Sequence, residues 1–287
     1  MRYVLGFVCV CALGLMPLVG CGTGPSELEC ESAEDCNDEN ECTADVCTGG
    51  VCSNTPAENG IACGDGACMD GICTTVADVS GSVFVIGADG VESPAVGATV
   101  SVRGTSISTT TDALAQFALR VPVGTVFLQT SHDGAWGWIE RWPVTEDGIM
   151  NLDFPVIADA TVTQAENELQ IEVDESKGVV EPFFDVVSGL GGETVTLNEQ
   201  HEFGMTPNAD GDWVSSDVIL PGVSEPWIAF FGVDVTDDLT VEPKGVDGEN
   251  TCRLSGPRDT PPAPPNTLYP VVAKFFTVVE VECTPVP

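Results

Sequence analysis

The chain contains 287 residues, of which 45 are acidic and nine are Lys or Arg, so its formal net charge is −36. This charge repels the phosphates of DNA, RNA and anionic membrane surfaces, and it excludes nucleic-acid binding. Divalent cations and basic proteins remain as electrostatic partners, although an acidic surface most often serves solubility. The length is enough for two or three domains.

Residues 1–20 have the pattern of a secretory signal peptide. Arg2 is their only charged residue, Val4 to Val19 is almost wholly apolar, and Gly20 ends the segment with a small side chain. This pattern is typical of a cleavable signal. The apolar run is too short, and wrongly flanked, for a stable membrane-spanning helix.

The four residues Leu18-Val19-Gly20-Cys21 resemble the lipobox of bacterial lipoproteins. The resemblance implies cleavage before Cys21, a diacylglyceryl group on its sulfur and usually an acyl chain such as palmitate on its amino end. Several buried acyl chains hold a protein on a bilayer stably, at about 0.8 kcal/mol for each buried CH₂. An ordinary signal peptide with a chance cysteine is the alternative.

The residues after the lipobox indicate where the anchor lies. Gly22 stands where an Asp tends to retain such lipoproteins at the inner membrane, so we expect the outer membrane, at its periplasmic or its cell-surface face. Residues 21–29 are then the lipidated cysteine and a short flexible tether.

Thirteen cysteines indicate a disulfide-rich exported protein. Two leave with the signal and Cys21 is lipidated, so ten remain, an even number in an oxidising compartment. We expect Cys252 and Cys283 to pair, which contributes about 3–4 kcal/mol in the chain-entropy model. The other eight lie in residues 30–73, at Cys30, Cys36, Cys42, Cys47, Cys52, Cys63, Cys68 and Cys73.

Residues 30–73 have few large apolar side chains, so disulfides must replace a core. Two segments, 42–52 and 63–73, share the spacing Cys-x₄-Cys-x₄-Cys and end in Gly-(Val/Ile)-Cys. Gly50 and Gly71 predict turns before short strands, but the spacing does not choose the disulfide connectivity. The module resembles cysteine-rich repeats in exported proteins of predatory soil bacteria. A zinc site is disfavoured, because there is no Cys-x₂-Cys pair and no nearby His.

Acidic side chains crowd residues 34–45 of this module. Carboxylate and carboxamide oxygens are ligands that Ca²⁺ takes. A solvated acidic face is the favoured alternative, since the spacing is not that of an EF-hand loop. The candidate calcium ligands are Asp35, Asp38, Asn40, Glu41 and Asp45.

Residues 79–158 predict a β-sandwich, because short β-branched runs alternate with Gly-containing turns. After a link at residues 74–78, strands are expected at 82–86, 98–102, 106–110, 116–119 and 125–129. The segments Gly81–Phe84, Asp89-Gly90, Ala95–Val102, Thr110–Asp112 and Gln116–Leu119 resemble the carboxypeptidase regulatory-like domain. The resemblance implies a seven-stranded prealbumin-type sandwich that is accessory and non-catalytic. Ala115 replaces the family's usual glycine, which disfavours a tight positive-φ turn there.

Trp136, Trp138 and Trp142 form a cluster late in this domain, with spacing that puts them on one face of an unbroken strand. Exposed rings could stack on the sugars of a glycan. The favoured interpretation is that they fill or edge the sandwich core, because Trp buries a large area.

Residues 159–287 predict a second, more divergent β-sandwich, and no helical period is evident. The Pro-rich segment 257–270 is expected to be an exposed connection, or alternatively a polyproline ligand. The strands expected here are 169–173, 179–187, 193–197, 227–231, 239–241 and 271–281.

The sequence contains no G-x-S-x-G, H-E-x-x-H or Gly-rich phosphate motif, and His132 and His201 lack metalloenzyme spacing. The expected fold is mainly β, with a disulfide-rich module before two Ig- or prealbumin-like sandwiches. We expect a non-enzymatic surface lipoprotein that binds glycan, cell wall or an envelope protein. The alternatives are a structural envelope protein with a Ca²⁺-stiffened stalk and, more weakly, an unrecognised hydrolase.

Overall fold

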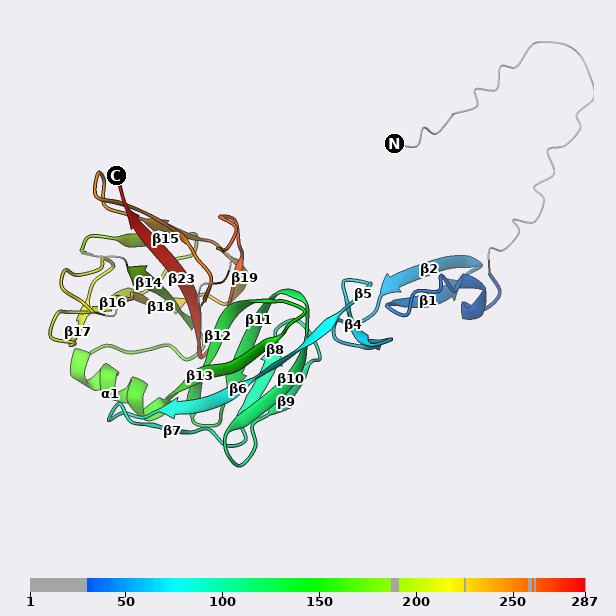
Figure 1. Ribbon diagram of the computed structural model, residues 1–287, viewed down its shortest axis with the longest axis horizontal. Coiled ribbons are helices and arrows are strands. Elements are labelled where there is room, and N and C mark those ends of the chain that lie inside the picture. The colour runs from blue at the N-terminus through cyan, green and yellow to red at the C-terminus, as the bar shows by residue number, and fades with distance from the viewer. Residues whose placement is uncertain (1–29, 187–190, 225, 258–259, 261, 287) are drawn as a thin grey trace, which may run out of the picture. The chain divides into compact units, whose positions relative to one another are not determined.

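The computed structural model describes residues 30–186, 191–224, 226–257, 260 and 262–286, and the protein is mainly β as predicted (Figure 1). Its described residues fall into two compact units. The first contains residues 30–38 and Asp45–Asn54, and the second contains Glu39–Ala44 and all described residues from Thr55 onward.

The internal cysteine repeat forms the same β-hairpin twice. One hairpin joins β1 (Thr43–Thr48) to β2 (Val51–Pro56), and the other joins β4 (Gly66–Met69) to β5 (Ile72–Thr74), beside the short β3 (Ala62–Cys63). The two loop residues have positive φ in both hairpins, at 62° and 82° for Gly49 and Gly50 and at 51° and 79° for Asp70 and Gly71. This is the type I′ turn that suits a two-residue hairpin loop. The predicted turns at Gly50 and Gly71 are therefore confirmed.

All ten cysteines predicted to be oxidised form disulfides. The Cys252–Cys283 pair is confirmed and joins opposite residues of β21 (Asn250–Leu254) and β23 (Phe275–Pro285). In the cysteine module, the last two cysteines of each hairpin form disulfides with cysteines earlier in the chain. Each disulfide therefore links residues on either side of a cysteine that belongs to another disulfide. The four pairs are Cys30–Cys47, Cys36–Cys52, Cys42–Cys68 and Cys63–Cys73.

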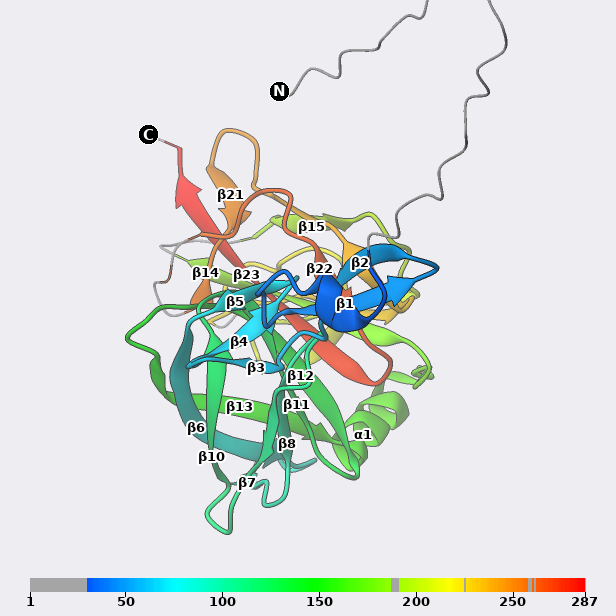
Figure 2. The same ribbon diagram turned by 90° about the vertical axis from the view of Figure 1, so that its right-hand side faces the viewer.

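The first β-sandwich packs two layers around one apolar core. The core includes Val79, Phe117, Leu128, Trp142 and Phe154, all buried. One layer consists of β6 (Val76–Ile86), β7 (Glu92–Pro94), β10 (Gln116–Pro122) and β13 (Ile149–Ala158). The other, whose β8, β11 and β12 run side by side in Figure 2, consists of β8 (Thr99–Val102), β9 (Ser108–Thr110), β11 (Gly124–Ser131) and β12 (Ala135–Val144).

Two expectations for this sandwich are wrong. The link expected at residues 74–78 is reduced to Thr75, because β6 begins at Val76 and pairs with β10 from Val76 to Ser82. Ala115 does adopt a positive φ, of 60°. The Asp112 carboxylate accepts hydrogen bonds from the backbone N–H groups of Leu114 and Gln116, and this turn holds the alanine in the left-handed region.

The second β-sandwich continues the sheet of the first. Strand β12 pairs in parallel with β23, so that Trp138 lies opposite Phe276, and β23 pairs in parallel with β14 (Gly178–Val186). The sheet then continues through β18 (Ala229–Val233), β16 (Phe203–Pro207) and β17 (Trp213–Ser215). Two small sheets carry the remaining strands, β15 (Thr194–Leu197) with β20 (Val241–Lys244) and β19 (Thr236–Leu239) with β22 (Tyr269–Val271).

A helix that the sequence analysis missed covers the other face of this sheet. Helix α1 (Asp159–Leu169) follows β13 directly and buries Val162 in a cluster that includes Trp136, Phe231 and Phe276. Its sequence is largely polar and has no N-cap side chain, so the three-to-four-residue period is weak. The strand predicted at residues 169–173 does not form, because α1 extends to Leu169 and residues 171–173 are irregular.

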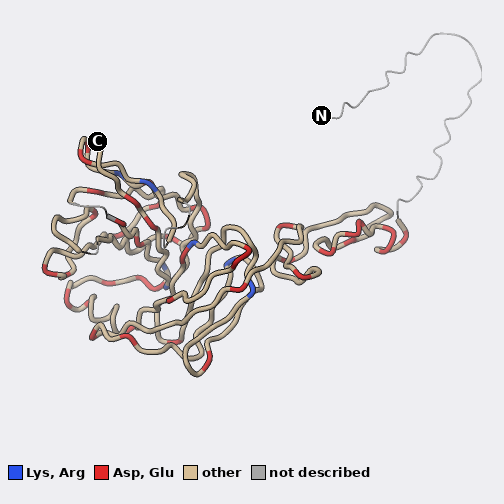
Figure 3. The backbone as a smooth tube through the Cα atoms, viewed as in Figure 1, with Lys and Arg blue, Asp and Glu red and all other residues tan. Residues whose placement is uncertain are grey.

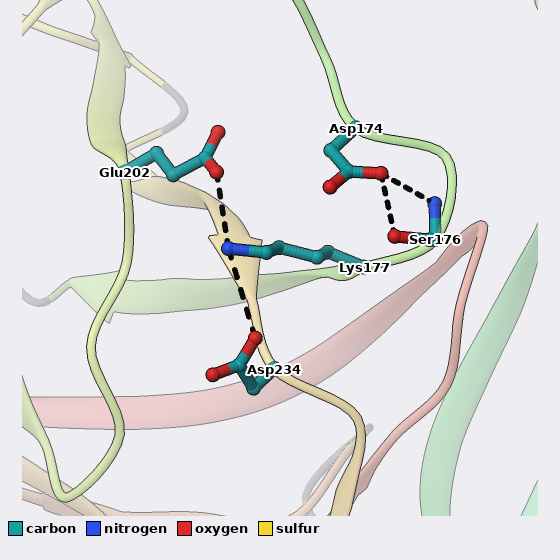
Figure 4. A network of polar contacts seen from close by, with 5 residues as sticks. All are labelled: Asp174, Ser176, Lys177, Glu202 and Asp234. Atoms are coloured by element: carbon teal, nitrogen blue, oxygen red, sulfur yellow. Dashed lines mark hydrogen bonds and ion pairs between the residues drawn. The ribbon is translucent and has the colours of Figure 1, made fainter.

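The few basic residues are unevenly distributed along the chain. None lies between Arg2 and Arg103, so the cysteine module carries acidic side chains alone (Figure 3). Lys177 instead joins three segments of the second sandwich. Its Nζ lies 3.0 Å from Glu202 Oε1 and 3.6 Å from Asp234 Oδ1 (Figure 4). The hydrogen bond to Glu202 is the main cause that raises the pKa of Lys177.

Candidate functional site

A groove of about 400 Å³ opens beside the exposed side chain of Trp213. Three segments of the second unit border it, namely α1, the loop between β6 and β7, and the turn that leads into β17, and these elements lie on one side in Figure 1. Small-molecule sites usually have volumes of about 300–1,000 Å³ and combine apolar walls with a few polar groups. The groove therefore has the size of a ligand site.

One face of α1 forms a wall of the groove. Its groove residues follow the spacing of a single helix face, at Thr161, Gln164, Ala165, Glu168 and Leu169. The Thr161 hydroxyl donates to the Ile86 carbonyl at 2.9 Å, which ties the helix to the end of β6. Gln164 donates to Glu168 Oε1 at 2.7 Å. The wall thus presents hydroxyl, carboxamide and carboxylate groups in fixed positions.

The opposite wall contains only small residues of the β6–β7 loop. Gly87, Ala88 and Gly90 line the groove there. The Gly87 N–H donates to the Val91 carbonyl and the Gly90 N–H donates to the Gly87 carbonyl, at 3.1 and 2.9 Å, which closes the loop on itself. The absence of larger side chains at these three positions leaves space above the helix face.

A compact turn presents Trp213. The Asn208 carboxamide oxygen accepts the backbone N–H groups of Asp210 and Asp212, both at 2.9 Å, and Gly211 provides a φ of 86°. Asn and Gly are typical of such turns, because Asn mimics a backbone acceptor and Gly tolerates positive φ. The turn fixes where β17 begins, and Trp213 is its first residue.

Trp227 supports Trp213 from behind. The two rings meet edge to face, with centroids 4.9 Å apart and an interplanar angle of 74°. Such aromatic pairs stabilise a fold by about 0.5–1.5 kcal/mol in addition to the hydrophobic contribution of their buried area. Trp213 nevertheless keeps 39% of its surface exposed, so the supported ring still offers area to a ligand.

The groove combines the two features that a saccharide requires. The C–H groups of a pyranose can pack on the π-face of an indole, while its hydroxyls exchange hydrogen bonds with carboxylate, carboxamide and hydroxyl groups. Trp213 supplies the aromatic ring, and Gln164, Glu168 and Asp212 supply polar groups around it.

The predicted tryptophan cluster does not form an exposed stacking surface. Trp136 and Trp142 are only 1% and 4% exposed and belong to different cores. Trp138 is half-buried and stacks on Phe276, with centroids 6.2 Å apart. The favoured prediction that these residues fill the core is confirmed, and glycan stacking on Trp136 and Trp142 is wrong because their rings are covered.

Several of the predicted calcium ligands form hydrogen bonds within their own unit. Asp35 accepts the backbone N–H groups of Glu31 and Ser32, both at 2.9 Å, and these bonds lower its pKa. Asn40 donates to the Gly71 carbonyl, and Glu41 accepts the Gly64 N–H at 2.8 Å. Asp35, Asp38 and Asp45 belong to the first unit, whereas Asn40 and Glu41 belong to the second. Among the described residues, no three carboxylates bring oxygens within 4.8 Å of one another, and the calcium site stays a prediction.

Two other residues singled out in the sequence, Cys21 and His201, are not among the described residues that line the groove. Cys21 lies outside the described residues. His201 packs edge-on against Phe230 at 4.6 Å, and its Nε2 lies 3.5 Å from Asp217. In the described part of the chain, no helix is long and apolar enough to cross a membrane.

Two half-buried acids share one face of the joined sheet. Glu181 on β14 and Glu280 on the neighbouring β23 both have their pKa raised from 4.5 to about 7. Burial is the main cause in each case, and the second cause is a nearby carboxylate, Glu280 for Glu181 and Asp185 for Glu280. Both groups lie away from the groove and are structural rather than ligand-facing.

Sequence reasoning missed Trp213 because a lone tryptophan in a polar segment forms no spacing pattern. A local sequence pattern could have indicated it. The residues immediately before the tryptophan, Asn208-Ala-Asp-Gly-Asp212, are typical of a tight turn. A tight turn at the start of an edge strand is a place where a large aromatic side chain stays accessible.

No protein-family model matches the chain, and no curated protein matches its sequence. Several solved structures are similar at a low level, among them the following three. The TIE protein of Bacillus anthracis has 8% identity and a TM-score of 0.24 over 74% of this chain, which spans 35% of its length. The shaft pilin SpaA of Lactobacillus rhamnosus GG has 8% identity and a TM-score of 0.23, covering 74% of this chain and 100% of the pilin. The major pilin T-13 of Streptococcus pyogenes has 10% identity and a TM-score of 0.23, covering 73% and 96%. Similarity at this level does not establish a shared fold or function.

Proposed function

We propose that this protein is a non-enzymatic, lipid-anchored surface protein that binds a saccharide in the groove beside Trp213. The observation that carries the proposal is the exposed ring of Trp213, which Trp227 contacts edge to face and which shares its groove with the hydroxyl, carboxamide and carboxylate groups of one helix face. A glycan or another component of the cell envelope is the corresponding partner.

The anchor belongs to the same proposal and rests on the lipobox sequence, Leu18 to Cys21. The five disulfides support a location outside the cytoplasm, because such bonds persist in oxidising compartments. We assign the first sandwich to the carboxypeptidase regulatory-like type on its sequence motifs, which makes it an accessory module. The outer membrane is the proposed location because Gly22 follows the lipidated cysteine.

Binding of the full-length, detergent-solubilised protein to immobilised neutral polysaccharides tests the saccharide site. We expect the wild-type protein to bind, Trp213→Ala to lose at least tenfold in affinity, and Trp213→Phe to retain part of it. Trp142→Phe is the matched control, because that ring is buried in the core of the first sandwich and should not affect binding. Equal binding by Trp213→Ala and wild type would contradict the proposal, and release of shortened sugars would favour the hydrolase alternative.

Incorporation of radiolabelled palmitate tests the anchor. The wild-type chain should become labelled and sediment with membranes, whereas Cys21→Ala should do neither. Labelling of Cys21→Ala at the wild-type level would show that the lipobox assignment is wrong.

A purely structural role is the second candidate, and one observation favours it. A single sheet runs through both sandwiches by way of β12 and β23, which is an arrangement suited to a rigid spacer. This role requires no small ligand, so it predicts that Trp213→Ala has no effect on any function of the protein in the envelope.

A further inference from the structure

A second, smaller cavity adjoins Trp213. It has a volume of about 20 Å³ and shares Thr161, Ala165 and Trp213 with the open groove. Its remaining lining is apolar and includes Val162, Val173, Phe231 and Phe276. The two cavities therefore meet at Trp213, one polar and open, the other small and apolar.

The size of the small cavity limits what can enter it. A dry cavity of roughly 150 Å³ admits a benzene molecule, so about 20 Å³ has room for a group of methyl size and not for a ring. A lone water would also fit, but it needs two to four polar partners. Among the described lining residues, only the Thr161 hydroxyl and the Trp213 indole N–H are polar side-chain groups, so an apolar group is the better occupant.

The rim of the cavity can also satisfy an amide. The Thr161 hydroxyl donates its hydrogen bond to the Ile86 carbonyl, at 2.9 Å. A hydroxyl oxygen has two acceptor lone pairs, so this oxygen can accept an N–H from a ligand. The hydrogen-bond acceptor and the methyl-sized cavity are thus adjacent. An acetamido group requires this arrangement, because its N–H needs an acceptor and its methyl group needs an apolar cavity.

The charge around the groove selects against acidic sugars. Glu168 and Asp212 both line it, and the whole chain has a formal charge of −36. A carboxylated or sulfated sugar would meet like charges there, which is unfavourable. A neutral or cationic sugar is therefore favoured over an acidic one, and the apolar cavity favours the neutral, acetylated form of an amino sugar.

We infer that the groove recognises a neutral N-acetylated hexosamine, whose ring packs on Trp213 and whose acetamido methyl enters the cavity beside Val162. The inference rests on the saccharide site proposed above and adds the substrate class. It also assigns a specificity role to Val162, which lines the small cavity but not the open groove.

Calorimetric titration of the full-length protein in detergent with two tetrasaccharides tests the inference. Chitotetraose and cellotetraose share one backbone linkage and differ only in having acetamido or hydroxyl groups. We expect chitotetraose to bind about tenfold more tightly, from burial of one methyl group and one hydrogen bond. Val162→Ile adds one methylene to the cavity and should abolish this preference without weakening the binding of cellotetraose. Val100→Ile adds the same methylene to the core of the first sandwich, outside both cavities, and is the matched control that should keep the preference.

The outcomes separate the two levels of the proposal. If neither sugar binds, both the saccharide site and its specificity are overturned. If both bind with equal affinity and Trp213→Ala binds neither, the site stands and the N-acetyl inference is overturned. A preference for chitotetraose that survives in Val162→Ile, with a thermal transition like that of wild type, overturns the assignment of the cavity.

Discussion

Trp227 meets Trp213 edge to face, 4.9 Å between ring centroids, and it is the contact that holds an exposed tryptophan in one orientation. Trp227 itself is half-buried and precedes β18, so the orientation of Trp213 on β17 depends on a residue from another part of the sheet. The groove is therefore built by residues far apart in the chain, and this dependence can be tested directly.

Trp227→Ala should weaken saccharide binding several-fold and lower the free energy of unfolding by about 2 kcal/mol, less than the 3–5 kcal/mol typical of a fully buried aromatic. Trp227→Phe keeps an edge contact and should retain most of both. Denaturant unfolding and calorimetric titration of the same samples measure the two effects. Unchanged affinity in a folded Trp227→Ala would show that Trp213 needs no support.

The joint between the sandwiches should be sensitive to a single methyl group. A Cβ at Gly137 would overlap the ring of Phe275 on the paired strand β23. Gly137→Ala should therefore lower the free energy of unfolding by about 1–3 kcal/mol, the usual cost of overpacking. Adding Phe275→Leu should recover part of the loss. The measurement is tryptophan fluorescence in a denaturant titration, and an unaffected Gly137→Ala would refute the tight joint.

The pH dependence of stability should reveal Glu181 and Glu280. Their folded-state pKa values, about 7, lie above the ordinary value of 4.5, so the folded protein binds protons more tightly than the unfolded chain. Their contribution is fully present below about pH 4.5 and is lost as the pH rises through about 7. The free energy of unfolding should fall over this range.

The variant Glu181→Gln with Glu280→Gln isolates this effect, because glutamine stays neutral at every pH. Its stability curve should be flatter between about pH 4.5 and 7 than that of the wild type. Asp237→Asn, which changes an exposed acid, is the control and should keep the wild-type slope. Parallel curves for the double variant and the wild type would contradict the prediction.

The disulfide between β21 and β23 should contribute more than the strand pairing around it. Replacing both Cys252 and Cys283 by Ser should lower the free energy of unfolding by about 3–4 kcal/mol, since the bond closes a long loop. Thr251→Ala changes the neighbouring register pair and should cost less than about 1 kcal/mol. Equal losses in urea unfolding for the two variants would mean that the crosslink itself adds little.

Lys177 should stabilise the second sandwich in a salt-dependent way, because its partners Glu202 and Asp234 are at the surface. Lys177→Met should lower the Tm, and the difference from wild type should shrink between about 0.1 M and 1 M salt as the charges are screened. Lys244→Met, at the exposed end of β20, serves as the control. A difference that salt does not change would indicate lost packing rather than lost charge.

Local sequence patterns predicted much of the fold. Cysteine spacing and the glycines at 50 and 71 indicated the hairpins, because a two-residue type I′ turn has strict chemistry. The Cys252–Cys283 pair followed from parity alone. Helix α1 was missed because it needs little apolar surface of its own, since it only covers a face that Trp136, Phe231 and Phe276 already make apolar.

The candidate site could not be predicted in the same way. Tryptophans 136, 138 and 142 form a visible pattern, but Trp136 is buried in the cluster that α1 covers and Trp142 in the core of the first sandwich. The joint itself, a parallel pairing of β12 with β23, depends on strands more than a hundred residues apart in the chain. The groove then arises from α1, a loop and a turn that this joint brings together, and no local sequence signal records that proximity.

The crossed disulfides also limit how far the cysteine module can be stretched. Without them, the backbone from Cys30 to Cys73 could extend to about 150 Å under load. With the disulfides intact, force applied between Cys30 and Cys73 is carried by a shorter covalent path. This path crosses the Cys30–Cys47 disulfide, runs back five residues to Cys42, crosses the Cys42–Cys68 disulfide and runs five residues on to Cys73. That path is only about 45 Å long when taut. Mechanical force can therefore unravel the hairpins of this module without letting the sandwiches move far from residue 30.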